Sequence, residues 1–134
     1  MLSHLTISAK DFDRAYEFYT AFTNLLGLPL RLLEQENRFA VWSCADGSRP
    51  YLILCTPVDE QDHHPGNGQM FAFTADSPAT VDACHEAALR AGCQSEGEPG
   101  LRPHYHPDYY GAYFRDPSGN KLCVVCHEPQ SGTV

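Results

Sequence analysis

The sequence predicts an α+β fold of two βαβββ modules that form curved sheets around a concave cavity, with the helices on the outer faces. In each half, an alternating segment is followed by an amphipathic helix and then by three strand-like segments. A polar stretch, PVDEQDHHPGNG (residues 57–68), lies between the halves, which span about 1–57 and 68–128. Residues 1–128 are therefore expected to form a single domain, and 129–134 a flexible tail.

The first strand is predicted within residues 2–9, where apolar and polar side chains alternate. Leu5 and Ile7 share one face and are expected to meet the helices, so His4 and Thr6 point into the concave face.

A helix follows, with Asp11 able to cap its start and Gly27 able to end it. Its apolar positions recur at helical spacing: Phe12, Ala15, Tyr16, Tyr19, Phe22 and Leu26. Strands are then expected at roughly 30–35, 38–45 and 50–56.

The second half repeats this order without strong sequence identity to the first. A strand at 69–75 precedes a helix capped by Ser77, with Pro78 at its first position and Gly92 at its end. Further strands are expected at 94–98, 111–116 and 120–127.

Composition excludes several classes of partner. The chain of 134 residues has a formal net charge of −8 and no Lys/Arg cluster, which makes nucleic acid and anionic membrane surfaces poor partners. No apolar run approaches the ~20 residues of a membrane span, and the start lacks the features of a signal peptide. We therefore expect a cytoplasmic protein whose six cysteines are free thiols.

The last strand contains two cysteines in CxxC spacing, Cys123 and Cys126. Side chains three residues apart on a strand point to opposite faces, and redox CxxC pairs normally open a helix. Alternation sends Cys126 toward the helix and Cys123 toward the cavity. On the fifth strand, Met70 occupies the position that corresponds to His4 in the repeat.

Four stretches together resemble a known family: SHLTISAKDFDRAYEFY, GNGQMFAF, RPHYHPDYYGAYFRDP and DPSGNKLCVVCH. The chain resembles the vicinal oxygen chelate superfamily, which includes glyoxalase I, extradiol dioxygenases, and fosfomycin- and bleomycin-resistance proteins. The resemblance covers residues 2–128, and the segment HYHPDYYGA is similar to a glyoxalase-like bacterial subgroup.

The resemblance also implies where a metal would bind. Metal-containing members use His or Gln on the first strand, His on the fifth and Glu on the eighth; the matching positions are His4, Met70 and Cys123. A His/Met/Cys set is soft, whereas divalent metals that activate oxygen substrates prefer imidazole and carboxylate ligands. We therefore expect no divalent metal and no other cofactor. A soft metal at these three residues is an alternative, and so is a nucleophilic Cys123 activated by His4.

A loop rich in Tyr and His precedes the seventh strand and is a candidate cavity rim. Its candidate residues are His104, Tyr105, His106, Tyr109 and Tyr110. A loop that simply packs through its own hydrogen bonds is an equally good interpretation.

The function expected is binding of a small molecule in the concave cavity, by a protein that resembles a metal-using family but has a degenerate metal site. The resemblance implies a homodimer as well. The alternatives are a metal-dependent lyase, isomerase or dioxygenase with atypical ligands, and a non-catalytic dimerisation module. The sequence identifies neither catalytic residues nor a ligand.

Overall fold

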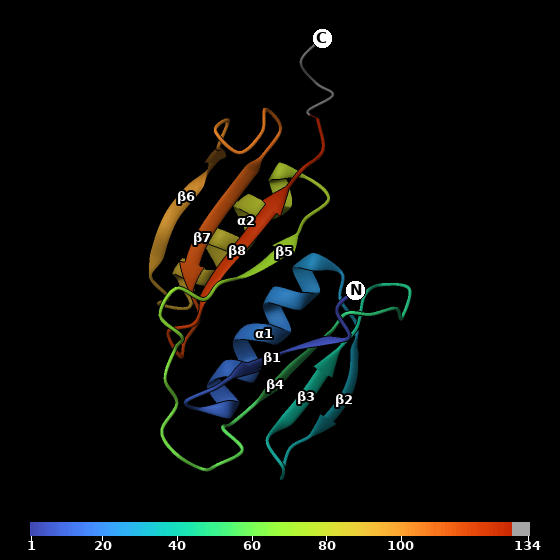
Figure 1. Ribbon diagram of the computed structural model, residues 1–134, viewed down its shortest axis with the longest axis vertical. Helices are drawn as coiled ribbons and strands as arrows, with labels where there is room; N and C mark the ends of the chain where they lie inside the picture. The colour runs from blue at the N-terminus through green and yellow to red at the C-terminus, as the bar shows by residue number, and fades with distance from the viewer. Residues whose placement is uncertain (130–134) are drawn as a thin grey trace.

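The computed structural model describes residues 1–129 and consists of two modules, each a four-stranded sheet with one helix (Figure 1). The first module comprises β1 (His4–Ser8), α1 (Phe12–Leu26), β2 (Leu30–Glu34), β3 (Phe39–Trp42) and β4 (Tyr51–Cys55). The second comprises β5 (Phe71–Thr74), α2 (Pro78–Arg90), β6 (Ser95–Leu101), β7 (Tyr110–Arg115) and β8 (Lys121–Cys126). The predicted tail, apart from Pro129, lies outside the described residues.

The two sheets have the same topology. Their strand orders are β1-β4-β3-β2 and β5-β8-β7-β6, and in each the first strand pairs in parallel with the last. The remaining neighbours pair antiparallel. The predicted α+β fold of two βαβββ modules is confirmed.

The helix ends follow the predicted capping residues. The Asp11 carboxylate accepts from the Arg14 amide, and Gly27 ends α1 with a left-handed φ of 73°. Ser77 caps α2 in the same way, with Pro78 at the first position. The strand predicted at 94–98 is longer, because β6 continues to Leu101 alongside β7.

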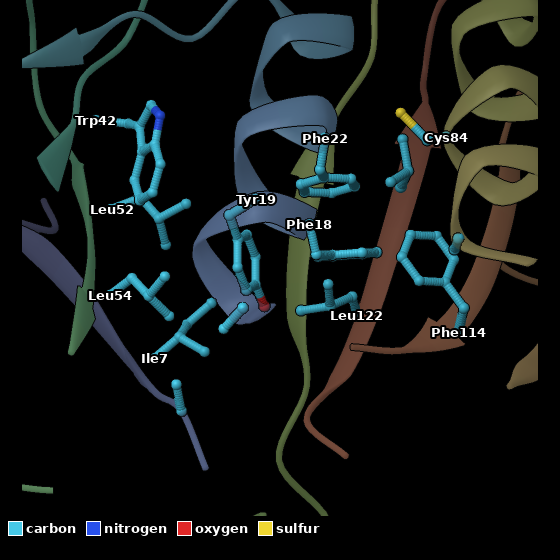
Figure 2. Close-up of a cluster of buried hydrophobic side chains, with 14 of the residues drawn as sticks. Ile7, Phe18, Tyr19, Phe22, Trp42, Leu52, Leu54, Cys84, Phe114 and Leu122 are labelled. Atoms are coloured by element: carbon cyan, nitrogen blue, oxygen red, sulfur yellow. The ribbon is translucent and has the colours of Figure 1, made fainter. Parts of the chain in front are cut away.

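Helix α1 lies between the two sheets and contributes to both halves of the core (Figure 2). Tyr19 faces Trp42 in the first module, with ring centroids 6.4 Å apart. Phe22 instead meets Phe73 and Phe114 of the second module, at 5.0 and 5.9 Å. The two modules therefore share one hydrophobic core.

The turn between β7 and β8, DPSGN, adds a buried polar connection between the modules. The Asp116 carboxylate accepts from the Tyr19 hydroxyl at 2.6 Å and from the Ser118 and Asn120 amides. The Asn120 side chain donates both to Asp116 and to the Ser8 carbonyl of β1. Burial and the neighbouring Asp116 carboxylate raise the pKa of Tyr19 well above its usual value, so its hydroxyl stays a donor.

Within residues 1–129, neither helix has the length and apolar composition needed to cross a membrane.

Candidate functional site

An open cavity of about 760 Å³ lies on the second sheet. It is on the side of the sheet away from the shared core, since Leu122 and Val124 of β8 point into that core and Cys123 points the other way. Its lining residues all come from the second module and the segment before it: Asn67, Gly68, Gln69, Met70, Tyr105, His106, Tyr109, Tyr113, Arg115, Lys121 and His127.

Two tyrosines and a cysteine form a hydrogen-bonded group at the floor of this cavity. The Tyr109 hydroxyl lies 2.8 Å from that of Tyr113 and 3.6 Å from the Cys123 sulfur. Burial raises the pKa of all three groups, so they remain protonated at neutral pH. Burial therefore disfavours the thiolate that a nucleophilic Cys123 would need.

Glycines on the same face make room for these rings. A Cβ on Gly111 would lie 2.9 Å from the Tyr109 ring, and one on Gly97 would lie 3.1 Å from the Tyr113 ring. Either contact would force the aromatic ring to move. Gly111 and Gly97 thus leave the space in which the Tyr109 and Tyr113 rings lie over the sheet.

Cationic side chains surround the floor. Lys121 and Arg115 face each other across β7 and β8, and Arg115 forms an ion pair with Glu96 at 2.7 Å. The Arg102 guanidinium lies 5.5 Å from the centre of the Tyr113 ring, and the carbonyls of Glu98 and Gly100 hold it there. The positive charges of Lys121 and Arg102 favour the Cys123 thiolate, but burial outweighs them, and the pKa of the thiol is raised.

A histidine pair ties the loop before β7 to the residue after β8. The Asp108 amide donates to His106 Nδ1, which leaves the other ring nitrogen, Nε2, as the donor. That Nε2–H donates to His127 Nδ1 at 2.8 Å. The loop is thereby fixed beside the cavity, with the Tyr105 and Tyr109 rings 4.9 Å apart.

The structure does not gather all of the predicted site residues in one place. Met70 lines the cavity and is 43% exposed, while Cys123 is fully buried beneath Tyr109. His4 lies in β1 of the other module, opposite Tyr51, and its Nδ1 is hydrogen-bonded to the Ser3 hydroxyl. The three positions do not share a cavity within one chain, because only the second module contributes to its lining.

The predicted rim residues divide in a similar way. Tyr105, His106 and Tyr109 line the cavity, and His104 stacks against Tyr105 at 4.2 Å without lining it. Tyr110 differs from the expectation, because its hydroxyl donates to Asp82 of α2 on the other side of the sheet. This bond raises the pKa of Tyr110 to about 12. Strand alternation turns Tyr110 away from its neighbour Tyr109.

Sequence reasoning did not assign Tyr113, Arg115, Lys121 and His127 to the cavity. A signal for the first three was present in the turn at Asp116. A hairpin through that turn pairs Arg115 with Lys121 and Tyr113 with Cys123, which places all four on one face. No comparable signal existed for His127, whose position depends on the loop that contacts it.

These residues do not fit the metal site implied by the resemblance. Met70 offers only a thioether, and Cys123 is a protonated thiol already hydrogen-bonded to Tyr109. Across residues 1–129, no three or more His, Cys, Asp or Glu residues are grouped so that they could hold a metal ion. The family's ligand positions at Met70 and Cys123 thus lack the imidazole and carboxylate donors that Mn, Ni, Zn or Fe prefer.

Comparison with known proteins establishes the family. The family model for the glyoxalase/bleomycin resistance protein/dioxygenase superfamily matches residues 1–124, nearly the whole chain. The chain belongs to this superfamily. None of the curated proteins matches its sequence.

Solved structures agree with the family assignment. A glyoxalase/bleomycin resistance protein from Albidiferax ferrireducens T118 is 31% identical with a TM-score of 0.82, over 94% of this chain and 98% of that one. A lactoylglutathione lyase from Agrobacterium tumefaciens is 24% identical, with a TM-score of 0.62 over 94% and 92% of the two chains. A putative glyoxalase from Bacillus halodurans is 19% identical, with a TM-score of 0.71 over 94% and 95%. The last two share less than 25% identity and show the fold alone.

Proposed function

We propose that this superfamily member binds a small molecule in the cavity of its second module and needs no divalent metal to do so. The observation that carries the proposal is a cavity of about 760 Å³ with aromatic and hydrogen-bonding walls and no acidic side chain in its lining. This volume is within the range of small-molecule sites, about 300–1,000 Å³. Binding is supported rather than covalent catalysis, since Tyr109, Tyr113 and Cys123 all stay protonated.

Ligand-detected NMR with a library of small aromatic and aliphatic compounds tests this proposal. Met70→Trp puts a large side chain into the cavity at a half-exposed position, so hits that bind there should lose binding. Leu89→Trp is the matched control, because Leu89 is similarly exposed on α2 and does not line the cavity. Hits that bind both variants equally would contradict the proposed location.

Metal independence needs its own measurement. Elemental analysis after incubation with Mn, Ni or Zn and dialysis should find well under one ion per chain, and a chelator should leave ligand affinity unchanged. Stoichiometric metal that ligand binding requires would instead support the alternative, a metal-dependent enzyme with atypical ligands.

We further propose that the protein works as a homodimer. The edge strand β2 is exposed along its whole length and carries Leu30, Leu32 and Leu33, which are 38–44% exposed. An open edge with apolar side chains favours a protein partner. A second copy would cover this strand and could bring the first-module face that carries His4 over the cavity of its partner.

Size-exclusion chromatography with light scattering tests the dimer. Leu32→Glu should produce monomers, because it places a charge on the exposed edge strand. Val58→Glu is the control, since Val58 is an exposed apolar residue in the loop between the modules. A wild-type monomer would contradict the dimer, and a dimer unaffected by Leu32→Glu would contradict this interface.

The chain is also proposed to reside in the cytoplasm. All six cysteines are free, and reduced thiols are typical of that compartment. Fractionation of the native host cell, with a periplasmic marker as control, tests this location.

A further inference from the structure

The cavity has an excess of positive charge although the protein as a whole carries a formal net charge of −8. Among its lining residues, Lys121 and Arg115 are cationic and none is acidic. Arg115 is neutralised by Glu96, but Lys121 forms no ion pair within residues 1–129. Its ammonium group lies 5.8 Å from the centre of the Tyr113 ring, at the cavity floor.

Arg102 adds a second charge that no carboxylate neutralises in the described part of the chain. Its guanidinium is bound by two backbone carbonyls, at 2.8 Å each, and these neutralise none of its charge. A Cβ on Gly97 would come within 3.2 Å of this group, so the glycine leaves the space in which the guanidinium lies beside Tyr113. Two uncompensated cations therefore flank the same ring.

The floor also holds a hydrogen-bonding group of three protonated side chains, Tyr109, Tyr113 and Cys123. The Tyr109 hydroxyl lies 2.8 Å from that of Tyr113 and 3.6 Å from the Cys123 sulfur, which also interacts with Tyr113. Burial raises the pKa of all three groups, so each carries a proton that it can donate to an acceptor. An anionic oxygen is the acceptor that gains most from such a donor beside a cation.

One wall of the cavity is aromatic. Tyr105 is 61% exposed and packs against Tyr109, and the His106 ring contacts Tyr109 edge-on. The histidine pair holds this loop in place, so the wall exists before a ligand arrives. Exposed rings fixed in this way suit the flat face of another ring.

We infer that the cavity takes a flat aromatic anion, with its carboxylate or equivalent group at Lys121 and its ring along Tyr105 and Tyr109. This inference rests on the proposed function and adds the chemical class of the ligand. The negative charge lies near Lys121 and the hydroxyls at the cavity floor, and the charge of Arg102 beside the Tyr113 ring adds to the attraction.

The test compares two probes of the same shape, 2-naphthoate and its neutral amide 2-naphthamide, by titration calorimetry. Naphthoate should bind about tenfold more tightly, as expected for a hydrogen bond to a charged group. This preference should shrink at high salt. Lys121→Met should abolish the preference, while Lys10→Met should preserve it, because Lys10 lines a different depression in the first module.

Each outcome separates the inference from the proposed function. Equal binding of both probes, blocked by Met70→Trp, would overturn the anion inference and leave the proposed function standing. A preference that survives Lys121→Met would overturn the role of Lys121. Binding of neither probe would overturn the aromatic class, and the proposed function would then depend on the library screen. Naphthoate binding that survives Met70→Trp would place the anion elsewhere and overturn the inference.

Discussion

The two modules have the same strand order and helix position, but their open faces differ. In the first module, one row across the sheet reads Thr6, Ile53, Val41 and Leu32. The corresponding row in the second reads Ala72, Cys123, Tyr113 and Gly97. The first row is mostly aliphatic, and the second combines a glycine with groups that hydrogen-bond. Shared topology thus fixes where side chains point, and the residues at those positions decide which face can hold a ligand.

The largest effect is expected from breaking the core that the modules share. Phe22→Ala should lower the free energy of unfolding by about 3–5 kcal/mol, because the ring packs against Phe73 and Phe114 of the other module. Urea denaturation should still show one transition for both modules. Leu25→Ala, at an exposed site on the same helix, is the control and should cost about 0.5 kcal/mol or less. Two separate transitions in the wild-type protein would mean that the modules fold independently.

The polar connection between the modules should contribute less. Tyr19→Phe leaves Asp116 without one of its donors and should cost about 1–3 kcal/mol. Tyr16→Phe on the same helix is the control, because the Tyr16 hydroxyl forms no hydrogen bond within residues 1–129. The same measurement applies, and equal costs for the two variants would show that the Asp116 contact does not stabilise the fold.

Thiol reactivity distinguishes the two open faces directly. Cys55 is partly exposed on the first module, whereas Cys123 is covered by Tyr109, so iodoacetamide should modify Cys55 first. Burial raises the pKa of both thiols, so both rates should be low at neutral pH and rise as pH approaches and passes their usual pKa. Mass spectrometry of the labelled protein reads both sites. Tyr109→Ala should speed labelling of Cys123 alone; no change would mean that Tyr109 does not shield it.

The smallest effect is expected at the histidine pair. His127→Ala removes the partner of His106 and should cost about 0.5 kcal/mol of stability, yet speed amide exchange in residues 103–109. His64→Ala, an exposed histidine outside the second sheet, should leave that exchange unchanged. Unaltered protection in the His127 variant would mean that other contacts hold the loop.

Much of the fold was predictable because its signals are local. Asp11, Gly27 and Ser77 mark helix ends through their own backbone preferences, and alternation separated Cys123 from Cys126. The site was less predictable, because its composition depends on contacts between distant segments. Nothing local to His4 shows that its face lies outside the cavity of the second module.

The same limit explains the two neighbouring tyrosines. Tyr109 and Tyr110 are adjacent in sequence, and only the residue at which β7 begins decides which one reaches the cavity. The cover that Tyr109 forms over Cys123 also requires Gly111, whose role becomes visible only when the ring is in place. Sequence patterns predicted the positions on each strand but not the layer of side chains above them.

Packing on helix α1, rather than the 57–68 segment, holds the two modules together. The modules are joined through the two sides of this helix and through Asp116, while the 57–68 segment between them is largely exposed. Covalent continuity through that segment is therefore not what keeps the halves together. A protein engineer could open the chain there and rejoin it elsewhere, or insert a reporter, with the assembled architecture retained.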